Sequence, residues 1–123
     1  GDLFFMNDHE LTGIGHFNLM PEAKLCIGHP NGVAGNIQMT GLMNLNSGAD
    51  YEFDGHVNQV TNFLPTTTPN TIRSLYINND TSYKVTLVDD MTITGNLDVQ
   101  HDGTFFIDPA NTLIVDGDVL IHE

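Results

Sequence analysis

The sequence predicts an all-β fold and, within that class, a right-handed parallel β-helix (a β-solenoid) of about four to five coils. Three observations lead to this prediction. The 123 residues contain no sustained i, i+3, i+4, i+7 apolar stripe of the kind that marks an amphipathic helix. Apolar residues instead alternate with polar ones in many short runs. These runs also repeat along the chain, which is the sequence mark of a solenoid.

The alternating runs are expected to be short strands. Side chains two positions apart point to the same face of a strand, so each run places two apolar side chains together and its polar neighbours opposite. The runs extend from Phe17 and Leu19 near the start of the chain to Val119 and Ile121 near its end. Glycine, asparagine, aspartate and threonine separate them, as expected for turns between strands.

Three segments align without a gap and define the repeat. They begin at Gly15, Gly41 and Gly95, and each consists of a glycine, an alternating pair, a turn of four or five residues and a second alternating pair. Their starts are 26 and 54 residues apart, which corresponds to one and two units of roughly 27 residues. A second alternating pattern, at residues 70–77, lies between the second and the third copy. A similar pattern follows the third copy at residues 111–115.

Stacking of coils explains why such a repeat exists. One coil cannot bury its inward side chains alone, whereas coils about 4.8 Å apart form a continuous apolar interior. Parallel pairing places like residues above like residues, so we expect Gly15, Gly41 and Gly95 to stack at a corner where a β-carbon would clash. Crossover connections between parallel strands are almost always right-handed. An antiparallel sandwich also has short alternating strands, but it does not predict a gap-free internal repeat.

The charge balance excludes several functions. The chain has 16 acidic and 3 basic residues, for a formal net charge of −13. Nucleic-acid binding needs clustered Lys and Arg, and docking on an anionic membrane surface needs basic residues as well. No apolar run approaches the ~20 residues that cross a bilayer, so we expect neither a nucleic-acid partner nor membrane insertion. Cys26 is the only cysteine, so this sequence allows no intramolecular disulfide.

Two segments depart from the repeat and are expected to project as loops. Residues 28–35 are rich in turn formers, and residues 62–70 contain two prolines, which cannot donate to a strand ladder. Loops on a rigid scaffold are where binding usually occurs. The candidate ligand-binding residues are therefore the polar side chains of these loops, namely His29, Asn31, Asn62, Thr66, Thr67 and Thr68.

Neither the histidines nor the aspartates indicate a metal site. The six histidines form no H-x-x-x-H or H-E-x-x-H arrangement. The aspartates between residues 89 and 118 would suit Ca²⁺ bound at turns, but the sequence has no EF-hand loop and no nonapeptide calcium repeat. Aspartates that bond their own backbone in turns are the simpler interpretation. We therefore expect no metal site and no cofactor, with bound Ca²⁺ as the alternative.

Catalysis is not expected either, and no catalytic residue is assigned. Some parallel β-helices cleave polysaccharides, and Asp50 and Glu52 have the spacing to share one outward face. Lyase chemistry, however, needs Arg or Lys beside an acidic sugar, and the chain has only three such residues. Cys26 alternates out of phase with its apolar neighbours, so it should point outward, and no histidine or asparagine partner lies near it in sequence.

Several strings of the chain share one template. They are residues 17–28 followed by 35–37, residues 51–55 followed by 59–62, and the later segments 75–79, 85–87, 91–97 and 111–115. The template resembles the repeats of large secreted and cell-surface β-helix proteins of Bacteroidetes, over residues 11–121. This resemblance implies an adhesin-like substrate of the type IX secretion system. It also implies that residues 1–123 are a single β-solenoid segment of a longer repetitive protein.

The expected function is that of a structural or adhesive scaffold, secreted or on a bacterial cell surface. We expect this segment to lengthen the coil stack and to display its surface, without catalysis. Its expected partners are neighbouring coils of the same polypeptide, together with surface glycans or the secretion machinery. Two alternatives stay open. One is a carbohydrate-binding or carbohydrate-active β-helix, similar to polysaccharide lyases or glycoside hydrolases, and the other is a calcium-stiffened binding module.

Overall fold

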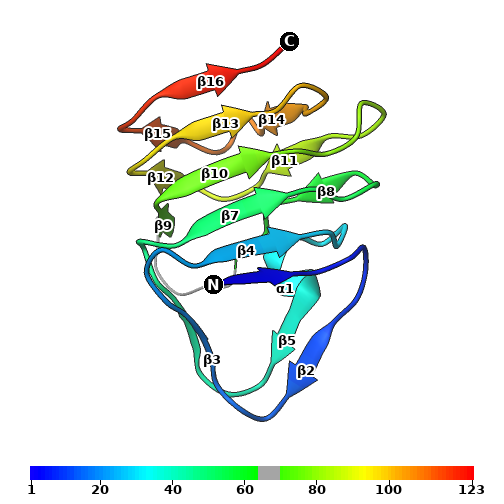
Figure 1. Cartoon of the computed structure of the whole chain (residues 1–123), viewed down its shortest axis with the longest axis vertical. Coiled ribbons are helices and arrows are strands. Elements are labelled where there is room, and N and C mark those ends of the chain that lie inside the picture. The colour runs from blue at the N-terminus through cyan, green and yellow to red at the C-terminus, as the bar shows by residue number, and fades with distance from the viewer. Residues whose placement is uncertain (64–69) are drawn as a thin grey trace.

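Parallel strands stack into a β-solenoid of about five turns in the computed structural model, which describes residues 1–63 and 70–123. Each complete coil contributes one strand to each of three sides of the stack (Figure 1). The side facing the viewer is a continuous six-stranded sheet. In stacking order its strands are β1 (Asp2–Phe4), β4 (Lys24–Ile27), β7 (Asp50–Phe53), β10 (Ser74–Ile77), β13 (Leu97–Val99) and β16 (Val119–Ile121). The predicted parallel β-helix is confirmed.

The other two sides of the stack are each interrupted between the second and the third coil. On the second side β2 (Leu11–Gly13) pairs with β5 (Ile37–Met39), and a separate sheet contains β8 (Gln59–Val60), β11 (Val85–Leu87) and β14 (Phe105–Ile107). On the third side β3 (Phe17–Leu19) pairs with β6 (Met43–Leu45), and a separate sheet contains β9 (Asn70–Ile72), β12 (Met91–Ile93) and β15 (Leu113–Val115). In Figure 1, β2, β3 and β5 lie apart from their counterparts in the later coils.

Inward side chains of the six-stranded sheet form a column through the interior. The strand register aligns Leu25 with Tyr51, Tyr51 with Leu75 and Leu75 with Leu97, and all four side chains are buried. Burial of one such side chain stabilises the fold by about 1.5–3 kcal/mol. Phe63, which follows β8, turns its ring into this column and meets the Tyr51 ring edge-on at a centroid distance of 4.9 Å. The buried column is therefore continuous between the second and the third coil, where the sheets on the other two sides of the stack are interrupted.

The first two of the three predicted repeat copies stack as expected. Phe17 of β3 pairs with Met43 of β6. A β-carbon on Gly41 would lie 2.2 Å from the carbonyl oxygen of Gly15, a distance that no side chain tolerates. Corner stacking of these two glycines is confirmed.

The placement of the third copy is wrong. Leu97, two residues after Gly95, lies in the six-stranded sheet beside Leu75, whereas the first two copies begin on the third side of the coil. Gly95 accordingly stacks with Gly117, whose β-carbon would lie 2.2 Å from the Gly95 carbonyl oxygen. More than one side of the coil carries the same glycine and alternation pattern, so the pattern alone does not distinguish one side from the next. Successive coils are 22 to 26 residues apart by strand register.

Residues 28–35 do not project as a loop, contrary to the prediction. The segment leads into the short helix α1 (Val33–Asn36) and packs along the third coil. The N–H groups of Val33 and Ala34 donate to the carbonyl oxygens of Thr61 and Asn62 at 3.2 and 3.1 Å. Val33 is also fully buried. Because pairing across coils satisfies its backbone polar groups, the segment is stable in the interior.

The side chain of Asn36 connects the second coil to the first. It is fully buried. Its Oδ1 accepts hydrogen bonds from the backbone N–H groups of Gly28 and His29, both at 3.1 Å. Its Nδ2 donates to the carbonyl oxygens of Asn7 and His9 at 3.2 and 2.7 Å. All four backbone groups lie outside the strands. The Asn36 amide therefore provides hydrogen-bond partners for backbone groups at a corner of the coil, where no strand ladder does so.

We predict that Asn36→Ala destabilises the protein by about 3 kcal/mol, because it leaves several buried backbone groups without a partner. The measurement is the free energy of unfolding in urea. The matched control is Asn44→Ala, on the exposed face of β6, which should change stability by less than about 0.5 kcal/mol. Equal losses for the two variants would contradict the role of Asn36.

Candidate functional site

The structure brings three of the six predicted ligand-binding residues together, His29, Asn31 and Asn62. Nδ2 of Asn62 donates to the carbonyl oxygen of Asn31 at 3.1 Å, and both side chains reach the surface. His29 is buried, and its Nδ1 accepts a hydrogen bond from the N–H of Asn31 at 2.9 Å. Residues 66–68, which include the three threonines, lie outside the described residues. Ligand binding at this place stays a prediction.

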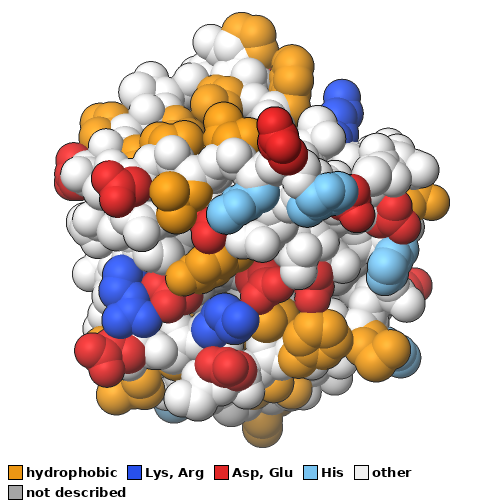
Figure 2. Space-filling model, turned by 45° about the horizontal axis from the view of Figure 1, so that its top comes forward, with side chains coloured by type: hydrophobic (Ala, Val, Ile, Leu, Met, Phe, Trp, Pro, Cys, Tyr) orange, Lys and Arg blue, Asp and Glu red, His pale blue; other side chains and the backbone are white. Residues whose placement is uncertain are grey.

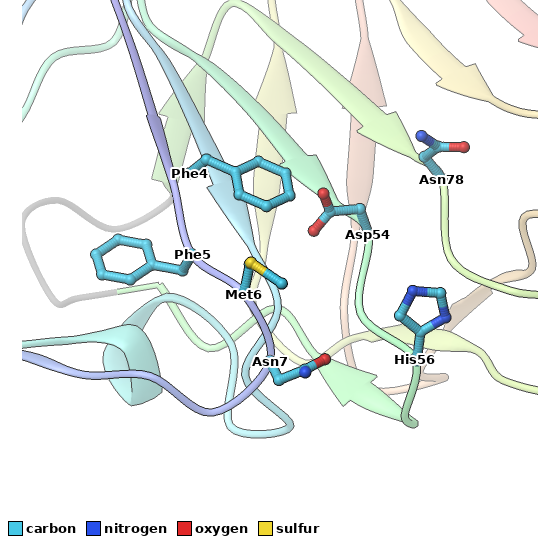
Figure 3. A pocket seen from close by; sticks show the side chains of 7 residues that line it. All are labelled: Phe4, Phe5, Met6, Asn7, Asp54, His56 and Asn78. Carbon is cyan, nitrogen blue, oxygen red and sulfur yellow. The ribbon is translucent and has the colours of Figure 1, made fainter.

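A more pronounced feature lies on the outer face of the six-stranded sheet, where the strands end. A depression of about 340 Å³ is lined by Phe4, Phe5, Met6, Asn7, Asp54, His56 and Asn78 (Figure 3). A second depression of about 360 Å³ is lined by His56, Asn78, Asn79, Asp80, Gln100, His101 and Asp102. The two adjoin at His56 and Asn78, which line both, and we call the two together the sheet-edge groove.

Strand register builds one wall of the sheet-edge groove. Asp54, Asn78 and Gln100 each follow a strand of the six-stranded sheet directly. Their N–H groups donate to the carbonyl oxygens of the preceding coil in the same way, at 3.1, 2.8 and 2.8 Å. The three side chains therefore occupy equivalent positions in successive coils and form a polar row.

The other side of the first depression is formed by the end of β1 and the segment that follows it, residues 4–7. This segment can approach because Gly28 has no side chain, since a β-carbon there would lie 2.5 Å from the backbone nitrogen of Asn7. Asn7 itself has a φ of 54°, a left-handed conformation that asparagine tolerates better than most residues. In Figure 3 the Phe4 side chain points toward Asp54. Apolar side chains of the first coil thus face polar ones in the first depression, whereas the second depression is lined by polar side chains alone.

Glu52 lies beside the groove and is held on both carboxylate oxygens. Nζ of Lys24 donates to Oε2 at 2.8 Å, and Nδ2 of Asn78 donates to Oε1 at 3.0 Å. Sγ of Cys26 lies 3.9 Å from Oε2. Burial raises the pKa of Glu52, but the hydrogen bonds from Lys24 and Asn78 outweigh burial and hold this pKa below its usual range. Glu52 is therefore a fixed, charged acceptor.

The neighbouring carboxyl group of Asp54 behaves in the opposite way. Burial raises the pKa of Asp54 from its ordinary 3.8 to about 6, and the negative charge of Glu52 adds to the rise. Below that pH the carboxyl group is protonated and offers a hydrogen-bond donor to the groove. The pKa values of Glu52 on β7 and of Asp54 just after it thus shift in opposite directions, because burial dominates at Asp54 whereas Lys24 and Asn78 bind Glu52.

Three histidines on this face lie against aspartate carboxyl groups. His56 Nδ1 lies 3.5 Å from an oxygen of Asp80, and His101 Nδ1 lies 2.8 Å from Asp102. Further along the sheet, His122 Nε2 lies 2.9 Å from Asp98. Figure 2 shows histidines and acidic side chains gathered on this side of the molecule, with the Lys and Arg at the left of the view against carboxylates.

Cys26 faces away from its apolar neighbours Leu25 and Ile27, as expected, but it is not accessible. Only 4% of its surface is exposed. Burial raises the pKa of the Cys26 thiol to about 11, and the charge of Glu52 adds to this shift. The thiol is therefore not activated as a nucleophile.

The described residues contain no group of three or more His, Cys, Asp or Glu side chains that converge on one point as metal ligands. Within the same part of the chain, no helix is long and apolar enough to cross a membrane. The expected absence of a cofactor, with Ca²⁺ bound at turns as the alternative, stays a prediction.

Sequence reasoning found Asp50 and Glu52 as outward acids but missed the groove. Asp54, Asn78 and Gln100 are 24 and 22 residues apart, and each comes one residue after an alternating pair. This recurrence was a usable signal, but the row becomes visible only when the coils are placed in their true register.

Comparisons with protein-family models, curated proteins and solved structures found no match to this chain. The fold and the sheet-edge groove are therefore the basis for inferring function.

We predict that Asp54→Asn stabilises the protein at pH 7 to 8 and has little effect below about pH 4. Since the pKa of Asp54 is higher in the folded state, its contribution to stability is present below the unfolded-state pKa of 3.8 and is lost as the pH rises through about 6. The gain is about 1 kcal/mol after allowance for solvent screening of a half-exposed side chain. Urea unfolding of both proteins across this pH range checks it, and a constant difference at every pH would contradict it.

Proposed function

We propose that this chain is a scaffold segment of a secreted or cell-surface protein, which extends a coil stack and displays its outer faces without catalysis. The observation that carries this proposal is the open interior at the last coil. Val119 and Ile121 take the register positions of Leu97 and Val99, so they continue the inward column. They are nevertheless 54% and 76% exposed.

The same end exposes apolar side chains on the other two sides of the stack. Ile107 of β14 and Ile114 of β15 are both exposed. β16 also ends the six-stranded sheet, so one of its edges has no neighbouring strand among the described residues. Exposed apolar surface and a free strand edge both favour a further coil as the partner. We propose that neighbouring coils of the same polypeptide cover this end.

The absence of catalysis is part of the proposal. Both oxygens of Glu52 are occupied by Lys24 and Asn78, so this carboxylate is poorly placed to act as a nucleophile or a base. Arg73 is likewise engaged, because its Nε and Nη2 donate to the Asp50 carboxylate at 2.8 and 2.6 Å. These contacts favour a structural role for the charged groups of the sheet.

The carbohydrate-related alternative is favoured by one observation, the sheet-edge groove. It is compatible with the scaffold role, because a rigid stack can hold a binding face without performing chemistry. A surface location and an adhesive role follow from the family resemblance described above and are proposed on that basis.

The scaffold proposal predicts that the stack accepts another coil. In the test variant residues 97–118, which form one coil by strand register, are duplicated in tandem. Small-angle X-ray scattering should record a particle longer by about 5 Å. The melting temperature should also rise, because an extra interface between coils adds stability.

The control for this experiment inserts the same residues in shuffled order. It keeps length and composition but lacks the alternating pattern, so it should lower the melting temperature and leave the insert sensitive to protease. If the duplicated and the shuffled proteins have the same dimensions and melting temperature, the chain is not an extendable scaffold.

A further inference from the structure

We propose that the sheet-edge groove binds an uncharged, extended polysaccharide whose chain runs along the stack from the first coil toward the fifth. This proposal adds a ligand to the scaffold and depends on a different set of residues from the open end.

The shape of the groove favours a long, repetitive ligand. Its two depressions, of about 340 and 360 Å³, lie end to end and share His56 and Asn78. Along the polar wall, Asp54, Asn78 and Gln100 recur once per coil, at the strand spacing of about 4.8 Å. An extended polysaccharide repeats its sugar units over a similar length, so successive units meet equivalent side chains.

The chemistry of the first depression suits a sugar ring, which has both an apolar face and polar edges. Phe4 is 58% exposed on one wall, next to the exposed Met6. Such a wall matches the C–H face of a pyranose, since aromatic side chains bind apolar faces of this size. The facing wall offers amide, carboxyl and imidazole groups, which donate to and accept from hydroxyl groups.

The electrostatics of the groove favour an uncharged ligand. The carboxylates of Glu52, Asp80 and Asp102 already have the partners Lys24, His56 and His101. The remaining carboxyl group, Asp54, is protonated below about pH 6. A polyanion would find no free cation here, because the one nearby lysine is bound to Glu52. A cationic peptide would have to displace existing contacts to reach Glu52, Asp80 or Asp102, and Asp54 offers it a carboxylate only above about pH 6.

Affinity gel electrophoresis tests the proposal with defined probes. The gels contain neutral polymers (xyloglucan, galactomannan or hydroxyethyl cellulose) or the acidic polygalacturonate, and a lysine octapeptide is tested by calorimetry. At least one neutral polymer should retard the protein, whereas polygalacturonate and the peptide should not bind. Phe4→Ala and Asn78→Ala should each weaken retardation roughly tenfold, because each removes a direct contact.

The matched control is Phe106→Ala. Phe106 is an aromatic side chain that is 47% exposed on β14, away from the groove, and Lys84 Nζ lies over its ring at 5.0 Å. Its loss should leave binding unchanged. Circular dichroism and urea unfolding check that each variant is folded. Asn78 also donates a hydrogen bond to Glu52, so if Asn78→Ala does not fold, Phe4→Ala alone tests the groove.

The outcomes separate the proposals. Failure of every neutral polymer to bind, or equal loss of binding in Phe106→Ala and Phe4→Ala, would overturn the groove assignment and leave the scaffold proposal intact. Binding of the octapeptide that strengthens as the pH rises through 6 would instead identify a cationic partner, because Asp54 then ionises. Release of new reducing ends from a bound polymer would confirm the ligand class but overturn the absence of catalysis.

Discussion

The parallel register of the six-stranded sheet is the constraint on which the rest of this molecule depends. Hydrogen bonds between successive coils place each residue directly above its counterpart, and side chains alternate between the interior and the surface. Leu25, Tyr51, Leu75 and Leu97 therefore become one buried column. The same register aligns Asp54, Asn78 and Gln100 at the strand ends. Stability and the binding groove thus come from a single arrangement, and a slip by one residue would exchange interior and surface side chains.

Buried side-chain amides form hydrogen bonds with backbone groups that have no partner in the strand ladders. At the corner between the first two coils Asn36 satisfies four backbone groups. At the next corner Gln59 has the same task, because its Nε2 donates to the carbonyl oxygens of Ile27 and His29 while its Oε1 accepts from the N–H of Gly55. Backbone groups buried at a corner would otherwise cost about 1–3 kcal/mol each. A stack of short strands needs such side chains because a large share of its backbone lies in turns.

Much of the fold was predictable from the sequence, because alternation over three or four residues is a local property. The strands around Phe17, Leu25 and Tyr51 and the parallel stacking of the first two repeats follow from it. The position of Gly95 was not predictable in the same way, since more than one side of a coil carries the same pattern and only long-range pairing identifies the side. Residues 28–35 were misassigned because turn-forming residues do not reveal that their backbone pairs with Thr61 and Asn62.

The outer column of the sheet, beside the groove, shows how the stack keeps its acidic side chains apart. A chain with a net charge of −13 that stacked like residues would place carboxylates directly above one another, which is destabilising. The register instead aligns Cys26, Glu52, Tyr76 and Asp98, so a neutral residue separates the two acids. Lys24 then binds Glu52 from the coil before it. The row that lines the groove follows the same pattern, because only Asp54 is acidic among Asp54, Asn78 and Gln100.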